Sequence, residues 1–192
     1  MNDLKTRISI TAQELFLSQG VEGVSMRKIA ERVGVTPTAI YRHFRDKEEV
    51  IEEIINAGLA TLSEYLAPAL KAEDPYQRLR QLIDAYLRFA LEQPRYFDLA
   101  FLVPGRASHI SEQLMQESAL TFKMAVEQVA LCMKMGIFRK EDPVEIAIYL
   151  WSIAHGLVML QRTNRFGDDP ERFSRLYRST IDRAVRGLRI DG

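Results

Sequence analysis

Apolar residues recur at spacings of three and four along most of the 192-residue chain. This spacing gathers them on one side of a helix, so the pattern predicts a series of amphipathic helices. No segment alternates apolar and polar residues as a half-buried strand does, and no Asn-Gly or Asp-Gly pair joins two such segments. The sequence therefore predicts an all-α fold of about nine helices.

Two short predicted helices in residues 25–47 are separated by a tight break. The first has Ser25 as its N-cap and ends at Gly34, because glycine adopts a left-handed backbone without steric penalty. Its apolar stripe consists of Met26, Ile29, Ala30 and Val33. Thr36 and Pro37 supply a capping hydroxyl and a suitable first residue for the second helix. The predicted break is two or three residues long.

The second of these helices buries Ile40 and Phe44 on one side, by helical periodicity. Its outward side chains are small, hydroxyl-bearing or cationic: Thr38, Ala39, Arg42 and His43. Tyr41 lies on the flank. A helix with this surface, held against another by a short glycine turn, is typical of a DNA-binding helix-turn-helix.

Charge is concentrated in the same segment. The whole chain has 26 Lys and Arg against 26 Asp and Glu, whereas residues 25–47 have six cations against two acids, a net charge of +4. A protein that coats nucleic acid indiscriminately is expected to be basic overall. The local charge instead favours one discrete docking site.

The segment IAERVGVTPTAIYRHFRDKEEV resembles the N-terminal DNA-binding domain of the TetR family of bacterial regulators, whose pattern is IA..VGVS...IY.HF..K..L. The match covers roughly the first quarter of the chain. The DNA-binding residues predicted from motif and resemblance together are Ser25, Arg27, Lys28, Thr36, Pro37, Thr38, Ala39, Tyr41, Arg42, His43 and Lys47.

These residues are expected to divide between bases and phosphates. Pro37, Thr38 and Ala39 suit base edges, since small side chains allow close approach. Arg42 can bind guanine or phosphate, and its later position on the helix favours phosphate. Phosphate or backbone contacts are expected, partly by resemblance, from Arg27, Lys28, Tyr41, His43 and Lys47. Helix-start chemistry and a solvated surface are the plainer explanations for individual members.

Caps and prolines delimit the other predicted helices. Asp3 is expected to cap a first helix ending at Gly20, and Asp46 with Glu49 to cap one that reaches about Leu70. The predicted domains are residues 1–47, for DNA binding, and 48–192, for effector binding and dimerisation. Later helices are expected from Pro75 to Pro94, across Tyr96–Leu102, and over Ser108–Met135, Asp142–Arg165 and Pro170–Leu188.

The predicted helix Asp142–Arg165 is apolar nearly all round in its middle, so it must be covered from two sides. Ala154 and Gly156 would allow a neighbouring helix to approach closely. The TetR resemblance implies that this helix and Pro170–Leu188 form the interface of a homodimer. The alternative is the most buried helix of a monomer. A two-fold dimer would present two reading helices about 34 Å apart and read a palindrome.

The predicted second domain contains candidates for an apolar effector site with one polar group: Phe89, Phe97, Phe101, Met115, Phe122, Trp151, His155 and Met159. Such residues at helical spacing are more often plain core. The resemblance implies a small-molecule effector between the helices, which favours a cavity. Phe97 and Phe101, bracketed by prolines, are the strongest candidates, while His155 is more simply a hydrogen-bonded core or interface histidine.

No cofactor, metal site or enzymatic motif is predicted. The three histidines lie far apart, and Cys132 has neither a nearby base nor a resolving partner for redox sensing. With no signal peptide and no uninterrupted run of about 18 apolar residues, the chain is expected to be cytoplasmic, with no membrane partner.

The sequence thus predicts a ligand-responsive transcription regulator, most simply a homodimeric repressor released from a palindromic operator when a largely apolar effector binds. The effector is expected to displace the far end of the helix beginning near Asp46 and thereby change the spacing of the reading helices. Two rivals remain at this point: a helical protein-interaction module, and a small-molecule enzyme on a helical bundle.

Overall fold

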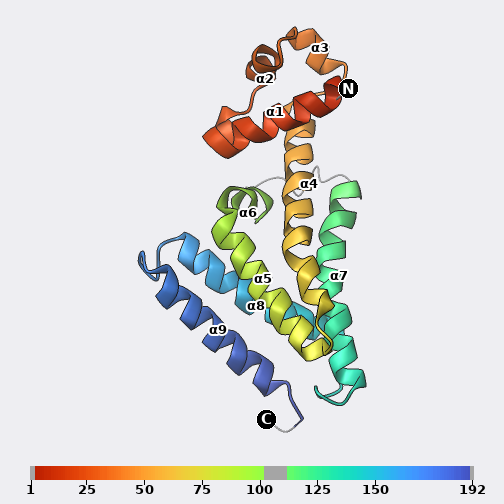
Figure 1. Cartoon of the computed structure of the whole chain (residues 1–192), viewed down its shortest axis with the longest axis vertical. Coiled ribbons are helices and arrows are strands. Elements are labelled where there is room, and N and C mark those ends of the chain that lie inside the picture. The colour runs from red at the N-terminus through yellow and green to blue at the C-terminus, as the bar shows by residue number, and fades with distance from the viewer. Residues whose placement is uncertain (1–2, 102–111, 191–192) are drawn as a thin grey trace. The chain divides into compact units, whose positions relative to one another are not determined.

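The computed structural model describes residues 3–101 and 112–190, including nine α-helices. In chain order they are α1 (Leu4–Gln19), α2 (Met26–Val33), α3 (Pro37–Tyr41), α4 (Lys47–Leu66), α5 (Pro75–Glu92), α6 (Pro94–Phe101), α7 (Glu112–Lys134), α8 (Pro143–Arg162) and α9 (Pro170–Gly187). Short 3-10 helices cover Val21–Gly23 and Ala67–Lys71. The predicted all-α fold is therefore confirmed (Figure 1).

The chain forms two compact units. The first contains α1, α2, α3, α4 as far as Thr61, and α6. The second contains the end of α4, α5, the described part of α7 from Ala119, α8 and α9. Because α6 belongs to the first unit, that unit is assembled from two separate stretches of sequence. The boundary predicted at residues 47/48 stays a prediction about function.

The first unit is built around the apolar stripe of α1, whose Ile8, Ala12 and Phe16 are buried. Ile29 of α2 and Ile40 of α3 are also fully buried in this unit. The first helix begins and ends as predicted, with Asp3 at its N-cap and Gly20 at its C-cap, but the Asp3 side chain makes no capping hydrogen bond. Packing of the apolar stripe therefore stabilises α1 more than its cap does.

Three helices end earlier than predicted. Helix α3 ends at Tyr41, so Arg42, His43 and Phe44 follow the helix instead of lying on it. The α-helical part of α4 ends at Leu66, because Pro68 has no N–H to donate to the carbonyl four residues earlier, and a 3-10 turn follows. Helix α8 ends at Arg162 and is followed by Asn164, which has a left-handed backbone (φ 56°). The predicted start at Ser108 and the end of the aromatic segment at Leu102 lie outside the described residues.

The second unit has a core of aromatic and aliphatic side chains between α5, α8 and α9. Tyr177 of α9 is fully buried, and its hydroxyl donates to the Ile83 carbonyl of α5 at 3.1 Å. Ion pairs Arg80–Asp182 and Arg178–Asp84 join the same two helices nearer the surface. Helix α9 is thereby fixed against α5.

Within the described part of the chain, α8 is the one helix long and apolar enough to cross a membrane by length and composition. Four of its apolar residues, Ile146, Leu150, Ala154 and Val158, are nevertheless buried in the core of the second unit. Packing in this core therefore explains the apolar residues on that side of α8.

Candidate functional site

The turn between α2 and α3 has the predicted geometry. The Ser25 hydroxyl accepts from the Lys28 N–H at 3.2 Å and caps α2. Gly34 adopts φ 78° and ψ 38°, the left-handed conformation that glycine tolerates best, and its N–H bonds to the Ala30 carbonyl at 2.9 Å. The Thr36 hydroxyl accepts from the Ala39 N–H at 3.3 Å at the start of α3. Two helices are thus joined through three residues.

Helix α3 has one buried side and one exposed side. Ile40 is fully buried and the following Phe44 is 2% exposed. The side chains exposed to solvent are Thr36, Pro37, Thr38, Tyr41 and Arg42, whereas Ala39 and His43 are partly covered. The α-helix itself ends at Tyr41, and the backbone N–H groups of His43 and Phe44 both bond to the Ile40 carbonyl. The exposed side is a compact polar and cationic surface.

The cations near α2 differ in their surroundings. Arg27 is exposed. Lys28 donates from Nζ to Gln19 Oε1 at 3.2 Å, and the partly buried Lys47 donates from Nζ to the Val21 carbonyl at 3.2 Å. Each lysine ammonium group has three N–H donors, so Lys28 and Lys47 retain N–H groups that can donate to a phosphate.

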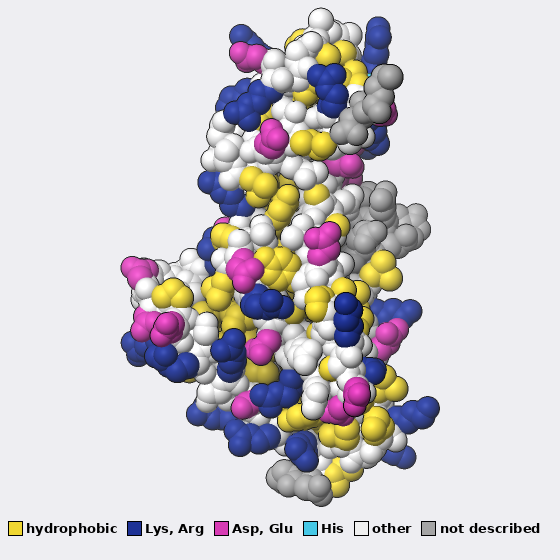
Figure 2. Space-filling model, in the orientation of Figure 1, with side chains coloured by type: hydrophobic (Ala, Val, Ile, Leu, Met, Phe, Trp, Pro, Cys, Tyr) yellow, Lys and Arg dark blue, Asp and Glu magenta, His cyan; other side chains and the backbone are white. Residues whose placement is uncertain are grey.

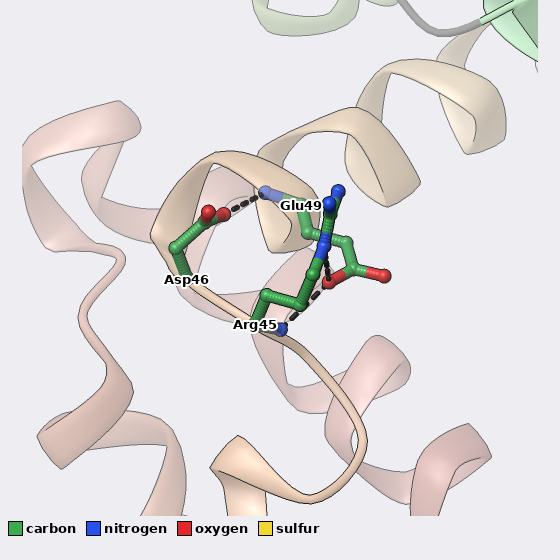
Figure 3. Close-up of polar contacts among 3 residues, drawn as sticks. All are labelled: Arg45, Asp46 and Glu49. Carbon is green, nitrogen blue, oxygen red and sulfur yellow. Dashed lines mark hydrogen bonds and ion pairs between the residues drawn. The ribbon is translucent and has the colours of Figure 1, made fainter.

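A reciprocal cap fixes the exit from this surface into α4 (Figure 3). Asp46 Oδ1 accepts from the Glu49 N–H at 2.8 Å, as the sequence pattern predicts. The Glu49 carboxylate returns to Arg45, accepting from its backbone N–H at 2.6 Å and pairing with its Nε at 3.3 Å. These bonds connect the first turn of α4 to Arg45 and Asp46, the residues that lead from α3 into α4.

Helix α6 packs on the first unit through contacts that the sequence analysis missed. Arg95 Nη1 donates to the Phe16 carbonyl at 3.0 Å, and the Tyr96 ring lies 5.8 Å from that of Phe16. A Cβ added at Gly58 of α4 would lie 2.9 Å from Tyr96 Cδ1. The sequence contained one indication of this contact. A glycine in the middle of a helix, such as Gly58 in α4, often marks the point where another part of the chain packs closely against the helix.

The structure brings three of the predicted effector residues together in the second unit. Phe122 and Trp151 have ring centroids 6.2 Å apart, and Trp151 and His155 lie 5.4 Å apart. The hydroxyl of Tyr86, which the sequence analysis missed, is hydrogen-bonded to His155 Nδ1 at 2.8 Å. His155 is thus hydrogen-bonded, as its simpler interpretation predicts. We call Tyr86, Phe122, Trp151 and His155 the aromatic cluster.

The polar groups of the aromatic cluster are neutral near pH 7. Burial lowers the pKa of His155, which favours the uncharged imidazole. Burial likewise raises the pKa of Tyr86, outweighing the opposing effect of its hydrogen bond with Trp151. The cluster therefore consists of aromatic rings and neutral hydrogen-bonding groups.

Four of the five other predicted effector residues have described side chains. Phe97 and Phe101 of α6 lie 5.0 Å apart in the first unit. Phe89 is 1% exposed and contacts Tyr65 in the second unit. Met159 is partly buried on α8, and the Met115 side chain lies outside the described residues. A single cavity lined by all eight residues stays a prediction.

Cys132 is buried, and burial raises the pKa of its thiol to about 11, with a smaller contribution from Asp74. At pH 8 the reactive thiolate would therefore be on the order of 0.1% of the protein. We expect iodoacetamide to leave native Cys132 unmodified and to alkylate it in urea, as measured by intact mass. Rapid alkylation of the native protein would contradict this protection.

The outward side of α8 exposes several large apolar residues together with Glu145 and Ser152. The large apolar residues, each between 41% and 47% exposed, are Val144, Ile148, Tyr149, Trp151 and Leu160. A Cβ at Gly156 would meet open space, whereas Ala154 packs inside its own chain and is not available for a close approach from outside. Helix α9 exposes Arg172, Arg175, Arg183 and Arg186, together with Leu176. Figure 2 shows Lys and Arg side chains gathered over α9.

No group of three or more His, Cys, Asp or Glu that could hold a metal ion occurs among residues 3–101 and 112–190.

Comparison with known proteins identifies both parts of the chain. Residues 10–54 match the model of bacterial regulatory proteins of the tetR family, and residues 79–184 match that of the tetracyclin repressor-like C-terminal domain. The uncharacterised HTH-type transcriptional regulator YobS of Bacillus subtilis is 25% identical over 78% of this chain and 74% of its own.

Two further similarities agree with these matches. The HTH-type transcriptional activator FasR of Mycolicibacterium smegmatis is 28% identical over 52% of this chain and 46% of its own. The crystal structure of the TetR-family regulator PfmR of Thermus thermophilus superposes with a TM-score of 0.68 at 26% identity, covering 95% of this chain and 98% of that one. Since the C-terminal model alone spans more than half of the chain, and the turn has the helix-turn-helix geometry, this protein belongs to the TetR family of DNA-binding transcriptional regulators and is not an enzyme.

Proposed function

We propose that this regulator is a cytoplasmic homodimer that represses transcription by binding a palindromic operator and leaves it when a small, largely apolar effector binds. The observation that carries the dimer is the apolar outward side of α8. Large apolar residues exposed singly are ordinary, but Val144, Ile148 and Trp151 recur at i, i+4 and i+7 and so share one side of α8, which is typical of an interface.

A second copy of the chain suits this patch. Pairing α8 with its two-fold copy covers the same residues on both subunits, as a two-fold interface requires. The exposed arginines of α9 favour an arrangement with α8 at the centre and the basic side of α9 towards water. Two reading helices are then available for two half-sites of a palindrome.

The surface of α3 would face the major groove in this proposal. Thr38 is small and exposed near the start of α3, which suits contact with base edges. Arg42 is exposed just beyond the helix, which suits a phosphate. The N-terminus of α2, with the cations Arg27 and Lys28, would provide further contacts to the DNA phosphates.

Selection of bound duplexes from a random pool tests the operator proposal. We expect a palindrome whose half-site centres are about one helical turn, or a multiple of it, apart. Affinity for the selected duplex should fall linearly with salt on a log–log scale. Absence of duplex binding at low salt would contradict operator binding and favour the helical interaction module.

Two substitutions should separate phosphate contacts from base contacts. Arg42→Gln should weaken binding to the selected and the scrambled duplex alike and flatten the salt slope by about one unit. Thr38→Val, a matched change of similar size, should alter the preferred sequence and leave the slope unchanged. Fluorescence anisotropy over a salt series measures both. Uniform weakening by both variants would refute this division of roles.

The sign of regulation needs its own measurement, since the related FasR is named an activator. A reporter gene placed behind a promoter with the selected duplex should be expressed less when this protein is present. Higher expression would contradict the repressor proposal and leave operator binding intact.

The effector proposal rests on the aromatic cluster in the second unit and on Phe97 and Phe101 in the first. Neutral polar groups among aromatic rings favour a largely apolar ligand. Such a ligand releases the operator only if it prefers the state in which the two reading helices are wrongly spaced. Helix α4 runs from the first unit into the second, so this change would reach the first unit along it.

A further inference from the structure

Helix α1 is fastened near both ends by an arginine bound to a backbone carbonyl. Near its start, Arg7 Nη2 donates to the carbonyl of Val33 in α2 at 2.7 Å. Near its end, the Phe16 carbonyl accepts from Arg95 Nη1 of α6 at 3.0 Å. Nine residues of helix separate the two points, or about 13 Å at 1.5 Å per residue.

The first contact lies at the turn that sets the reading helix. Val33 is the last residue of α2, so its carbonyl has no acceptor role within the helix. The N–H groups of Gly34 and Val35 bond to the Ala30 carbonyl instead. Arg7 satisfies the Val33 carbonyl and places a positive charge at the negative end of α2, one residue before the turn.

The second contact lies where α6 meets α1. The Phe16 carbonyl also accepts from the Gly20 N–H at 2.7 Å, so Arg95 reinforces the C-terminal end of the helix. Tyr96, the next residue of α6, packs its ring against that of Phe16. A movement of α6 therefore acts on α1 through both backbone and side chain.

Between these points α1 is packed along its apolar side. Its residues Ile8, Ala12, Leu15 and Phe16 are all 2% exposed or less. Packed helices move as units, because their interiors are close-packed and deform little. Displacement of one end of α1 is then delivered to the other end.

We infer that α1 is a strut that transmits the position of α6 to the turn between α2 and α3, with Arg7 and Arg95 as its positioning residues. This inference rests on the proposed function, since it describes how operator binding is controlled. It adds to continuous α4 a second route, within the first unit, from α6 to the reading helix.

A double-mutant cycle on operator binding tests the strut without any effector. Arg7→Gln and Arg95→Gln should each lower affinity for the selected palindrome by about threefold to tenfold, with salt slope unchanged. Residues this far apart without a shared partner normally have multiplicative effects. We expect the double variant to depart from the product by more than threefold in affinity, while shifts in melting temperature stay additive.

Controls distinguish positioning from general damage. Arg7→Lys keeps one donor and should recover part of the affinity. Arg88 is an exposed arginine of α5 in the second unit. In the double variant Arg7→Gln with Arg88→Gln, the loss of affinity should equal the product of the losses in the two single variants. If the effects of Arg7→Gln and Arg95→Gln on affinity simply multiply, the strut is wrong. It is also wrong if Arg7→Gln flattens the salt slope by about one unit, because that change indicates direct contact of Arg7 with a phosphate. If the wild-type protein selects no palindrome, the proposed function fails first.

Discussion

Replacing Ile148 with aspartate should convert the proposed homodimer into a monomer and lower affinity for the selected palindrome by about 100-fold or more. Ile148 is 47% exposed in the single chain, so the change leaves the core of the second unit intact. In the proposed dimer it would place a carboxylate from each subunit within the apolar interface formed by α8. Light scattering after size-exclusion chromatography gives the mass, and anisotropy gives the affinity.

The matched control for this substitution is Gln81→Asp, at an exposed position of α5. It adds the same charge to the second unit without touching α8 and should change neither mass nor affinity. A dimeric Ile148→Asp protein with normal operator binding would move the interface away from the outward side of α8.

The second large effect is expected at Gly58. Alanine in the middle of a helix is normally more stable than glycine by about 0.5–1 kcal/mol. Here the new Cβ would lie 2.9 Å from the Tyr96 ring, so Gly58→Ala should destabilise the protein by about 1–2 kcal/mol. Urea denaturation measures the free energy of unfolding.

Removing the Tyr96 ring should reverse the sign of this effect. In a Tyr96→Ala background, Gly58→Ala should stabilise the protein by about 0.5–1 kcal/mol, the ordinary helix preference. The same destabilisation in both backgrounds would mean that the Tyr96 contact is not its cause.

Local chemistry made the DNA-reading segment predictable. Ser25, Gly34 and Thr36 act within four residues of themselves, and each has the cap or backbone conformation that its sequence position predicts. Asp142 and Asp169 likewise accept the expected N–H groups at the starts of α8 and α9. Such bonds depend on neighbouring residues alone, so the sequence pattern is sufficient.

Long-range packing was less accessible to the sequence. The hydrogen bond between Tyr86 and His155 joins residues far apart in the chain, and neither periodicity nor spacing indicates it. For the same reason the eight effector candidates could not be divided between the two units. The early end of α4 has a local cause that the sequence contains. Pro68 ends the α-helix, but the apolar pattern continues past it to Leu70 and so predicted a longer helix.

The discontinuous first unit has a consequence for synthesis of the chain. Phe16 and Gly58 are synthesised before α5, yet the Tyr96 ring that packs on both is synthesised only afterwards, with α6. Domains usually fold as units during synthesis, N-terminal first. In this protein the DNA-reading unit becomes complete only after translation has passed through α5 of the second unit, which couples the maturation of the two halves.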